Sequence, residues 1–264
     1  MSSTTQESDR QVDAAAWQGF LALLKQSRPD RPLNGALVAV SVLDLMLWAK
    51  AERAKFAAHV RMRLSEMYAA LNQRFPVYVL VTKMDLLAGF TEFFGDYDPT
   101  NRMQVWGTTF DHGVDPAQIA QPYAVDFAAL EQRLNAEMMA RLHEEPDLQR
   151  RAAIYRFPQQ FHCVGPLTGE FLGLAFSTHV NQRPLQLRGV YFTSSTQKGN
   201  PVDPVLAAMA PTFHLERDTA ARIGVTGKSF FVTRLLREVV FPEAVLAAVE
   251  QAPPARPVES VPPA

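Results

Sequence analysis

The segment Thr82–Asp85, with the sequence Thr-Lys-Met-Asp, has the residue types and spacing to recognise a purine base. It follows directly on Val77–Val81, a continuous apolar run typical of a strand buried in a parallel sheet. A carboxylate fixed at such a strand end can accept paired hydrogen bonds from the ring N–H and the exocyclic amine of guanine. Lys83, two residues before Asp85, can lay its methylene stem along the base. The alternative interpretation makes Asp85 only the N-cap of the next helix.

A second strand end could complete the same pocket. The apolar run Gly189–Phe192 leads into three short hydroxyl residues, Thr193, Ser194 and Ser195. Their side chains and backbone N–H groups can contact a base when their strand neighbours the first one, because ligands of open α/β sheets bind beyond the carboxyl ends of the strands. The sequence therefore predicts that the two strand ends lie side by side. The residues that we expect to contact the base are Thr82, Lys83, Asp85, Thr193, Ser194 and Ser195.

Three other features resemble functional sites but lack the required spacing. Gly224–Ser229 ends in Gly-Lys-Ser, as a phosphate loop does, but Arg222 stands where that loop needs its first glycine. The six histidines show no metal-ligand spacing, since His143 has no second histidine four residues on. Cys163 is the single cysteine, which excludes an internal disulfide and a multi-thiolate zinc site. We therefore expect no catalytic residue and no metal site in this chain.

Composition narrows the class of protein. The 264 residues carry 26 basic and 27 acidic side chains, so no excess of positive charge directs the chain to nucleic acid. The longest apolar run, Gly35–Ala49, is interrupted by Asp44 and is shorter than the roughly 20 residues of a membrane-spanning helix. Met1–Arg10 is polar and lacks the apolar stretch of a secretory signal. These features predict a globular α/β protein of the reducing cytoplasm.

The elements that must position the candidate residues follow from hydrophobic periodicity. Continuous apolar runs predict strands at 36–40, 77–81 and 189–192, the first of them buried on both faces, and a short strand is expected at 153–156. Helical spacing predicts helices over 12–26, from Leu43 or later to about Arg74, over 126–143, over 159–180 with interruptions at Gly165-Pro166 and Gly169, and over 230–249. The stretch 89–123 reads as a long irregular excursion, and the tail from Pro253 as disordered.

The chain resembles the IcmF/TssM family, the large inner-membrane component of bacterial type VI secretion systems. The segments that carry the resemblance lie in family order over nearly all of residues 4–246; they are Asp13–Leu21, Arg31–Val40, Arg74–Phe90, Gln104–Gly107, Arg188–Ser194 and Leu235–Phe241. The resemblance implies an α/β fold with a partial phosphate-loop NTPase-like (small-GTPase-type) parallel sheet, flanked by helices and followed by a helical extension. It also implies a base-contacting role for Thr82, Lys83 and Asp85 and for the segment Thr193–Ser195.

The chain departs from the family pattern at its start. In the family, the phosphate loop and the magnesium-handling strand end both precede the stretch that here occupies Thr4–Arg10. We therefore expect an expressed fragment or a truncated gene product. Residues 1–200 would be the C-terminal half of the NTPase-like domain without its phosphate loop, 201–250 a helical extension, and 251–264 a Pro-rich disordered tail. The intact parent could bind GTP or ATP, whereas this chain is expected to bind neither tightly.

The resemblance favours a structural and interaction module that carries a guanine-type base-recognition motif. Two alternatives stay open: a working NTPase completed by the missing segment, and a pseudo-GTPase scaffold with no nucleotide role. The expected partners are other membrane-complex and baseplate proteins of the secretion system, with no nucleic acid. Contact with the membrane would come only through spans of the parent, at the cytoplasmic face of the inner membrane. Loss of the phosphate-loop strand would also expose the edge of strand 36–40 and favour self-association there.

Overall fold

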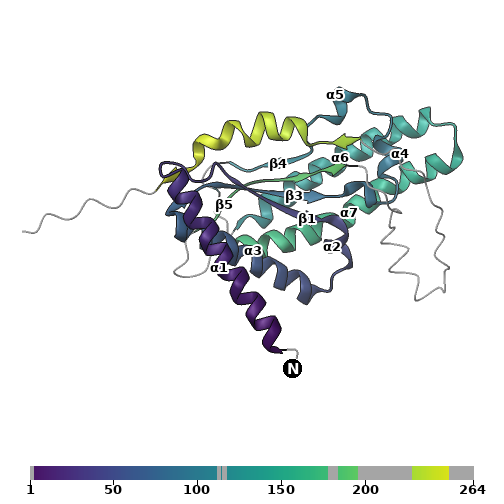
Figure 1. Ribbon diagram of the computed structural model, residues 1–264. Helices are drawn as coiled ribbons and strands as arrows, with labels where there is room; N and C mark the ends of the chain where they lie inside the picture. The colour runs from purple at the N-terminus through teal and green to yellow at the C-terminus, as the bar shows by residue number, and fades with distance from the viewer. Residues whose placement is uncertain (1–2, 112–113, 115–117, 178–183, 196–227, 250–264) are drawn as a thin grey trace, which may run out of the picture.

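The structure, a computed structural model, describes residues 3–111, 114, 118–177, 184–195 and 228–249, and of these the side chains of residues 13 to 247. Its centre is a four-stranded sheet in the order β1-β3-β5-β4 (Figure 1). The four strands are β1 (Ala36–Ser41), β3 (Pro76–Thr82), β5 (Gln186–Phe192) and β4 (Gly107–Thr109). The first three are parallel, and β4 pairs antiparallel with β5. The expected α/β class and its three parallel strands are therefore confirmed.

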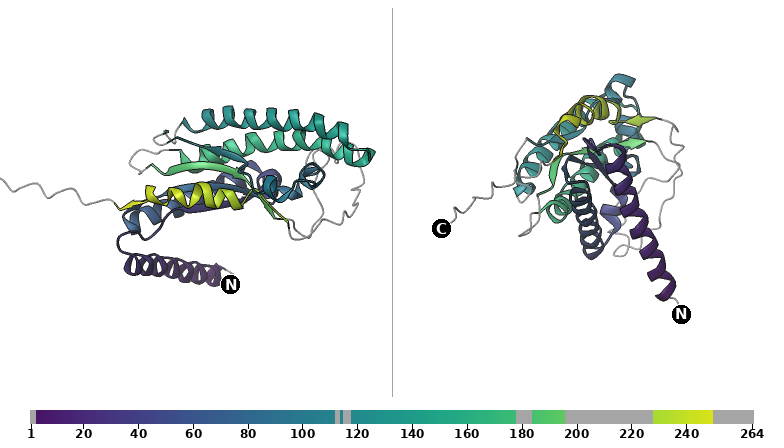
Figure 2. Two further views of the ribbon diagram at one scale, coloured as in Figure 1. Left: turned by 90° about the horizontal axis from the view of Figure 1, so that it is seen from above. Right: turned by 60° about the vertical axis from the view of Figure 1, so that its left-hand side comes forward.

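Helices α3, α6 and α7 pack on one face of this sheet, α1 packs on α3, and residues 228–249 lie on the other face (Figures 1 and 2). The helices are α1 (Ser3–Ser27), α2 (Val42–Leu47), α3 (Lys50–Leu71), α4 (Phe90–Phe94), α5 (Pro99–Arg102), α6 (Ala120–Glu144) and α7 (Leu148–Phe176). Shorter elements are η1 (Met84–Leu86), η3 (Leu235–Val240, a π-helix), η4 (Pro242–Leu246), and the strands β2 (Gln73–Arg74), β6 (Ser194–Ser195), β7 (Ser229–Phe230) and β8 (Ala248–Val249). No helix in the described ranges combines the length and the hydropathy that crossing a bilayer requires.

The prediction of a strand at 153–156 is wrong, because α7 runs through it without a break. The side chain of Asp147 caps the helix by accepting a hydrogen bond from the backbone N of Arg150 at 2.7 Å. Pro158 and Pro166 both lie inside the helix, so the prolines do not end it there. Apolar side chains at steps of three and four bury one side of α7 instead, and they include Ile154, Phe157, Phe161 and Val164.

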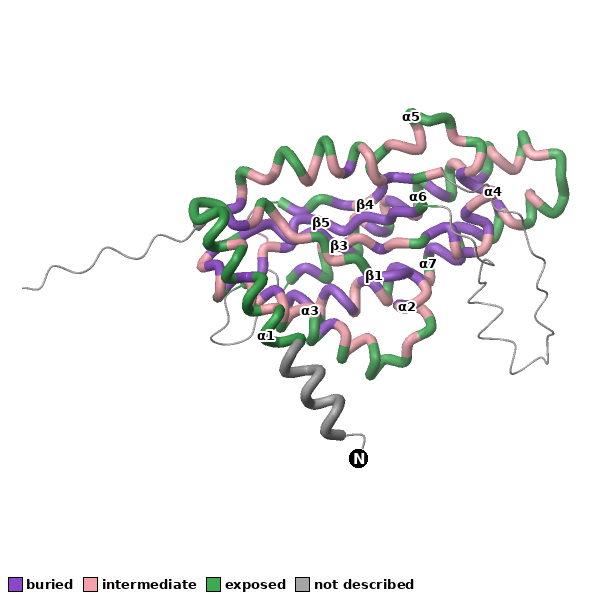
Figure 3. Tube along the Cα trace, viewed as in Figure 1, coloured by how far each residue is buried: buried purple, intermediate pink, exposed green. Residues whose placement is uncertain are grey.

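The description of β1 as buried on both faces is also wrong. Val40 is 2% exposed, whereas Leu37 is 47% exposed and Ala39 is exposed as well. β1 is the edge strand of the described sheet. Its side chains on one face pack on the core, whereas Leu37 and Ala39 on the other face are not covered. Within the described residues, β1 pairs with β3 on one side and with no strand on the other. Figure 3 shows that burial is most continuous along β3 and β5 instead.

The stretch 89–123, expected to be irregular, contains α4, α5, β4 and the first residues of α6. Its aromatic side chains form the centre of the main core. Trp106 stacks on Phe161 with ring centroids 4.8 Å apart, and Phe161 stacks in turn on Phe127 at 4.7 Å. Aromatic pairs of this kind stabilise a fold by about 0.5–1.5 kcal/mol each beyond the area that they bury. The excursion therefore builds the hydrophobic core that holds α6 and α7 against the sheet.

Residues 228–249, which we call the C-terminal strap, cross the opposite face of the sheet (Figure 2). At one end of the strap β7 pairs antiparallel with β6, and at the other β8 pairs antiparallel with β2. Leu235 forms a small second apolar cluster with Tyr78 and Tyr191 of the sheet. The described part of the expected helical extension is thus a helical segment between two short strands. The segment 196–227 and the tail 251–264 lie outside the described residues.

Candidate nucleotide-base site

The first candidate segment begins where β3 ends. Thr82 is the last residue of β3, and its Oγ1 donates a hydrogen bond to the carbonyl of Val40 at 3.2 Å. The next residue, Lys83, is exposed and has a left-handed backbone with φ 60° and ψ 37°. This conformation is uncommon for a residue with a Cβ atom and costs about 1 kcal/mol. The turn is closed by hydrogen bonds from the N of Leu86 to Lys83 O and from the N of Leu87 to Met84 O, both 3.0 Å long.

The second candidate segment meets the first through backbone and side-chain hydrogen bonds. The N of Thr193 donates to Val81 O at 2.9 Å, and the N of Met84 donates to Thr193 O at 3.3 Å. The hydroxyl of Ser194 accepts a hydrogen bond from the backbone N of Asp85 at 3.0 Å and donates one to Asp85 Oδ1. The ends of β3 and β5 therefore lie side by side, in the arrangement that a shared pocket requires.

This pairing holds the Asp85 carboxylate in a fixed place. Asp85 is 6% exposed and lies in the middle of η1, whose N-cap residue is Lys83. The N-cap of the following helix α4 is Gly89, so Asp85 does not have the capping role of the alternative interpretation. The backbone N–H and the carboxylate of Asp85 both bond to the Ser194 hydroxyl, so the carboxylate is oriented before a ligand binds. Such an orientation lowers the entropic cost of binding.

The six predicted residues differ in what they can offer a ligand. Thr193 and Ser194 are buried, at 4% and 3% exposure, whereas Ser195 and Lys83 are exposed. Thr82 is half-buried and its hydroxyl is turned to β1, away from the second segment. Lys83, Asp85 and Thr193–Ser195 thus lie at the two joined strand ends, whereas the Thr82 hydroxyl is bonded to the neighbouring strand β1. Which of them contacts a base stays a prediction.

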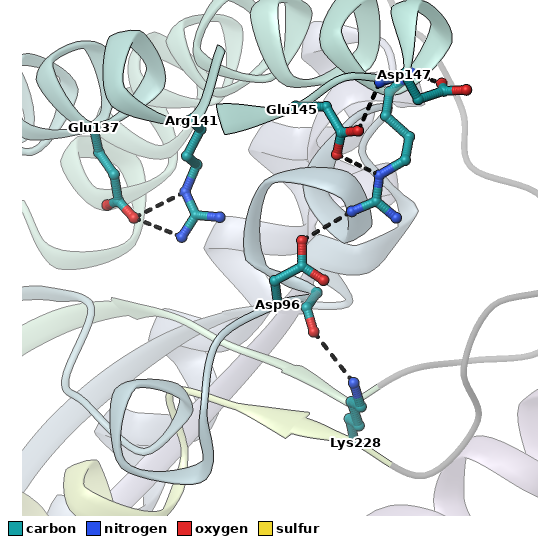
Figure 4. A network of polar contacts seen from close by, with 8 residues as sticks. Asp96, Glu137, Arg141, Glu145, Asp147 and Lys228 are labelled. Atoms are coloured by element: carbon teal, nitrogen blue, oxygen red, sulfur yellow. Dashed lines mark hydrogen bonds and ion pairs between the residues drawn. The ribbon is translucent and has the colours of Figure 1, made fainter. Parts of the chain in front are cut away.

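The end of the Gly-Lys-Ser stretch, which the sequence analysis rejected as a phosphate loop, lies beside the second candidate segment. Its described residues, Lys228 and Ser229, lead into a strand, and Ser229 pairs with Ser195. The Lys228 ammonium donates to the carbonyl of Gly95 at 3.2 Å (Figure 4). A phosphate loop leads into a helix, so the strand agrees with the rejection of this stretch as a phosphate loop. The apolar pair after Ser229 was the only signal of a strand here. Gly224–Gly227 lies outside the described residues.

His162 and Cys163 lie on α7, outside the two candidate segments. The Nδ1 atom of His162 lies 2.6 Å from Glu131 Oε1 at the surface, and the side chain of Cys163 is half-buried. The described part of the chain contains no group of three or more His, Cys, Asp or Glu side chains that could hold a metal ion.

Comparison with known proteins places this geometry in a family. The chain matches the model of the IcmF-related N-terminal domain over residues 10–257. It is 49% identical over 245 residues to the type VI secretion system component TssM1 of Pseudomonas aeruginosa PAO1. That alignment covers 91% of this chain and 22% of the relative, so the chain spans less than a quarter of the relative's length. No solved structure matches the chain. The match over most of its length shows that the chain belongs to the IcmF-related family, as its N-terminal domain.

Proposed function

We propose that this chain is a domain of a type VI secretion component, and that it acts as a structural and interaction module with a guanine-selective base site. The observation that carries the base site is the hydrogen bonding between Asp85 and Ser194, which brings two strand ends and a fixed carboxylate together. The relationship to TssM1 supports the secretion role. The left-handed backbone of Lys83 adds support, because local strain persists where the surrounding structure enforces it and is enriched at functional sites.

In this proposal each residue has a distinct part. The Asp85 carboxylate accepts hydrogen bonds from the ring N–H and the amine of guanine, and the Lys83 stem packs along the face of the base. Thr193 and Ser195 flank the opposite edge, while Ser194 holds Asp85 in place and Thr82 ties the turn to β1. Much of the affinity for GTP or ATP would come from phosphate and magnesium contacts that these residues do not make. Binding of a nucleotide to this chain alone should therefore be weak.

The test changes the hydrogen-bonding character of Asp85 with little change in its size. Asp85→Asn replaces a pure acceptor with a side chain that presents an N–H donor. That donor opposes the amine of guanine but matches the carbonyl at the same position of xanthine. We expect the intact protein to change its preference from guanine to xanthine nucleotides by at least about tenfold, which is about 1.4 kcal/mol. Fluorescent nucleotides labelled on the ribose give the readout, and Asp13→Asn on α1 is the control.

An unchanged preference in Asp85→Asn would refute the base site. Micromolar binding of GTP by this chain alone would contradict the expectation of weak binding. Turnover after mixing the chain with the segment that carries a phosphate loop would favour the working NTPase.

A scaffold without a nucleotide role is the second candidate, because Asp85 is only 6% exposed and already hydrogen-bonded. In that case Asp85 would serve to join β3 to β5. A scaffold predicts that Asp85→Ala lowers the melting temperature while GTP leaves the melting temperature of the intact protein unchanged. Stabilisation of the intact protein by GTP, lost in Asp85→Ala, would favour the base site instead.

The proposed partners are other membrane-complex and baseplate proteins, met at the cytoplasmic face of the inner membrane. The open edge of β1 offers a further contact, through which two copies of this chain could pair. Leu37→Lys places a charge on this edge strand at a side chain that is already 47% exposed. We expect the change to reduce concentration-dependent light scattering, with Leu23→Lys on α1 as the control. Scattering that is independent of concentration in the unaltered chain would count against pairing.

A further inference from the structure

A groove runs between α6 and the segment 94–106, and it shares no lining residue with the candidate base site. It consists of two adjoining hollows, of about 130 and about 480 Å³, whose walls have Tyr97 and Glu137 in common. The first hollow is mainly apolar and the second mainly charged. An occupant long enough to enter both would meet an apolar and an acidic surface side by side.

Rigid side chains line the smaller hollow. Its apolar walls are Phe94, Val105, Trp106, Leu130, Leu134 and Phe231, and its polar lining residues are Tyr97, Gln104, Arg133 and Glu137. Trp106 packs against Phe94 and Phe231 with ring centroids 5.3 and 5.1 Å apart, and all three rings are buried in the main core. Val105 is 37% exposed at the rim. Because the core fixes these rings, the hollow is preformed and suits one aliphatic side chain.

The larger hollow supplies the charge. Four carboxylates, those of Asp96, Asp98, Glu137 and Glu144, line it together with the single guanidinium of Arg141. Figure 4 shows Arg141 turned to Glu137, to which its Nε and Nη2 donate at 3.0 and 2.8 Å. Asp96 also forms an ion pair with Arg150 at 2.9 Å. The four carboxylates still outnumber the guanidinium groups of Arg141 and Arg150, and this negative balance favours a cationic occupant.

The hydrogen bonds of Glu137 leave one of its oxygens available. The Tyr97 hydroxyl donates to Oε1 at 2.6 Å, and both bonds from Arg141 end on the same oxygen. From the described residues, Oε2 accepts no hydrogen bond. Burial raises the pKa of Tyr97, and its bond to Glu137 raises that pKa further, so the phenol remains a donor. Glu144 is exposed and makes no ion pair with the described residues.

We propose that this groove binds a short segment of a partner protein in which an aliphatic residue lies within a few positions of an arginine or lysine. The aliphatic side chain fills the hollow under Val105. The cation lies among the carboxylates, within reach of Glu137 Oε2 and Glu144. Charge complementarity selects the basic residue and the preformed apolar hollow selects its neighbour, so neither feature alone determines the occupant. This surface is additional to the base site.

The probe is a fluorescein-labelled ten-residue peptide with a Leu-Ser-Arg-Arg core in a Gly/Ser background, measured by fluorescence polarisation against the full chain. Two control peptides replace the leucine by glycine or both arginines by glutamate. We expect both controls to bind at least about tenfold more weakly, and binding of the probe to weaken as salt is raised. Glu144→Lys and Val105→Glu should each weaken the probe by about tenfold. Asp13→Lys on α1 and Val125→Glu on α6 make the same charge changes outside the groove and should not weaken it.

Equal binding of the three peptides would overturn the proposal, as would groove variants that weaken the probe no more than their controls. If Val105→Glu lowers the melting temperature, Val105→Ser replaces it, because serine shortens the rim without adding charge. A dimer in size-exclusion chromatography that Glu144→Lys disperses would identify a second copy of the chain as the occupant, and would also overturn the proposal.

Discussion

The contact between Arg188 and Glu243 gives the sharpest test of how the C-terminal strap is held. Arg188 lies on β5 with its side chain 6% exposed, and Glu243 of the strap is 20% exposed. The pair is bidentate, with Nε to Oε2 at 3.0 Å and Nη2 to Oε1 at 2.6 Å. Nη1 of Arg188 also donates to the carbonyl of Phe110, and the Tyr78 hydroxyl donates to Glu243 Oε2 at 2.7 Å. Glu243→Gln removes the negative charge and keeps the shape.

Burial sets the magnitude of the loss. Removing one partner of a buried ion pair costs about 3–5 kcal/mol, because the other charge is left buried without compensation. Glu243 is partly exposed, so we expect the lower end, about 3 kcal/mol. For a chain of this size that corresponds to a fall in melting temperature of about 6–12 °C. Arg188→Met combined with Glu243→Leu removes both charges and should recover most of the loss, since apolar replacement of a buried pair is often neutral.

Two measurements check this expectation. Thermal unfolding gives the stability, and hydrogen exchange of residues 228–249 shows whether the strap opens before the sheet. The hydrogen bonds that Arg188 donates to the Glu243 carboxylate raise the pKa of Arg188 above its ordinary value. A raised pKa contributes stability that is complete below the unfolded value and is lost only as pH rises through the folded one. The stability that the charged Arg188 contributes should therefore stay constant between pH about 6 and 9. A loss below about 0.5 kcal/mol in Glu243→Gln, or a double variant no better than the single one, would refute the reasoning.

Two paired substitutions test the joined strand ends and the packing of α7. Ser194→Ala should lower the free energy of unfolding by about 1–2 kcal/mol, because it removes the hydroxyl from a buried hydrogen-bonded pair. Ser195→Ala, at an exposed position, should change the free energy of unfolding little. Equal effects of the two variants in denaturant titrations would contradict the assigned contact. Gly165→Ala places a Cβ 2.2 Å from the ring of Phe127 and should cost about 1–3 kcal/mol. Gly173→Ala meets nothing within 4 Å and should stabilise the helix by up to about 1 kcal/mol; melting curves of the two variants that shift in the same direction would contradict this assignment.

The sheet and the meeting of its strand ends could be predicted from the sequence because both follow from local patterns. Continuous apolar runs identified β1, β3 and β5, and polar residues placed directly after two of these runs must meet at one edge of a parallel sheet. Exposure could not be predicted in the same way. Leu37 and Val38 are both apolar, but Leu37 is 47% exposed because its side chain lies on the face of β1 that the described residues leave uncovered.

The errors and omissions have equally specific causes. The strand predicted at Ala153–Arg156 ends at Phe157-Pro158, but the apolar spacing continues through Pro158 as a helix. The strands β6, β7 and β8 have two residues each, too few for any periodicity. Arg188 directly precedes the apolar run 189–192, and no local pattern could identify its partner Glu243, 55 residues away.

The strap also determines how the domain would respond to a mechanical load. A pull on the chain at Val249 is first resisted by β8, whose two residues pair with β2. Backbone pairs each contribute only about 1 kcal/mol, so this end should peel away readily. The load then reaches Glu243, whose charged contact crosses to β5 and distributes the force over the sheet. At the other end of the strap, β7 pairs with β6, which contains Ser194. Tension large enough to break the ion pair would therefore next act on the pairing of β7 with β6, next to Asp85.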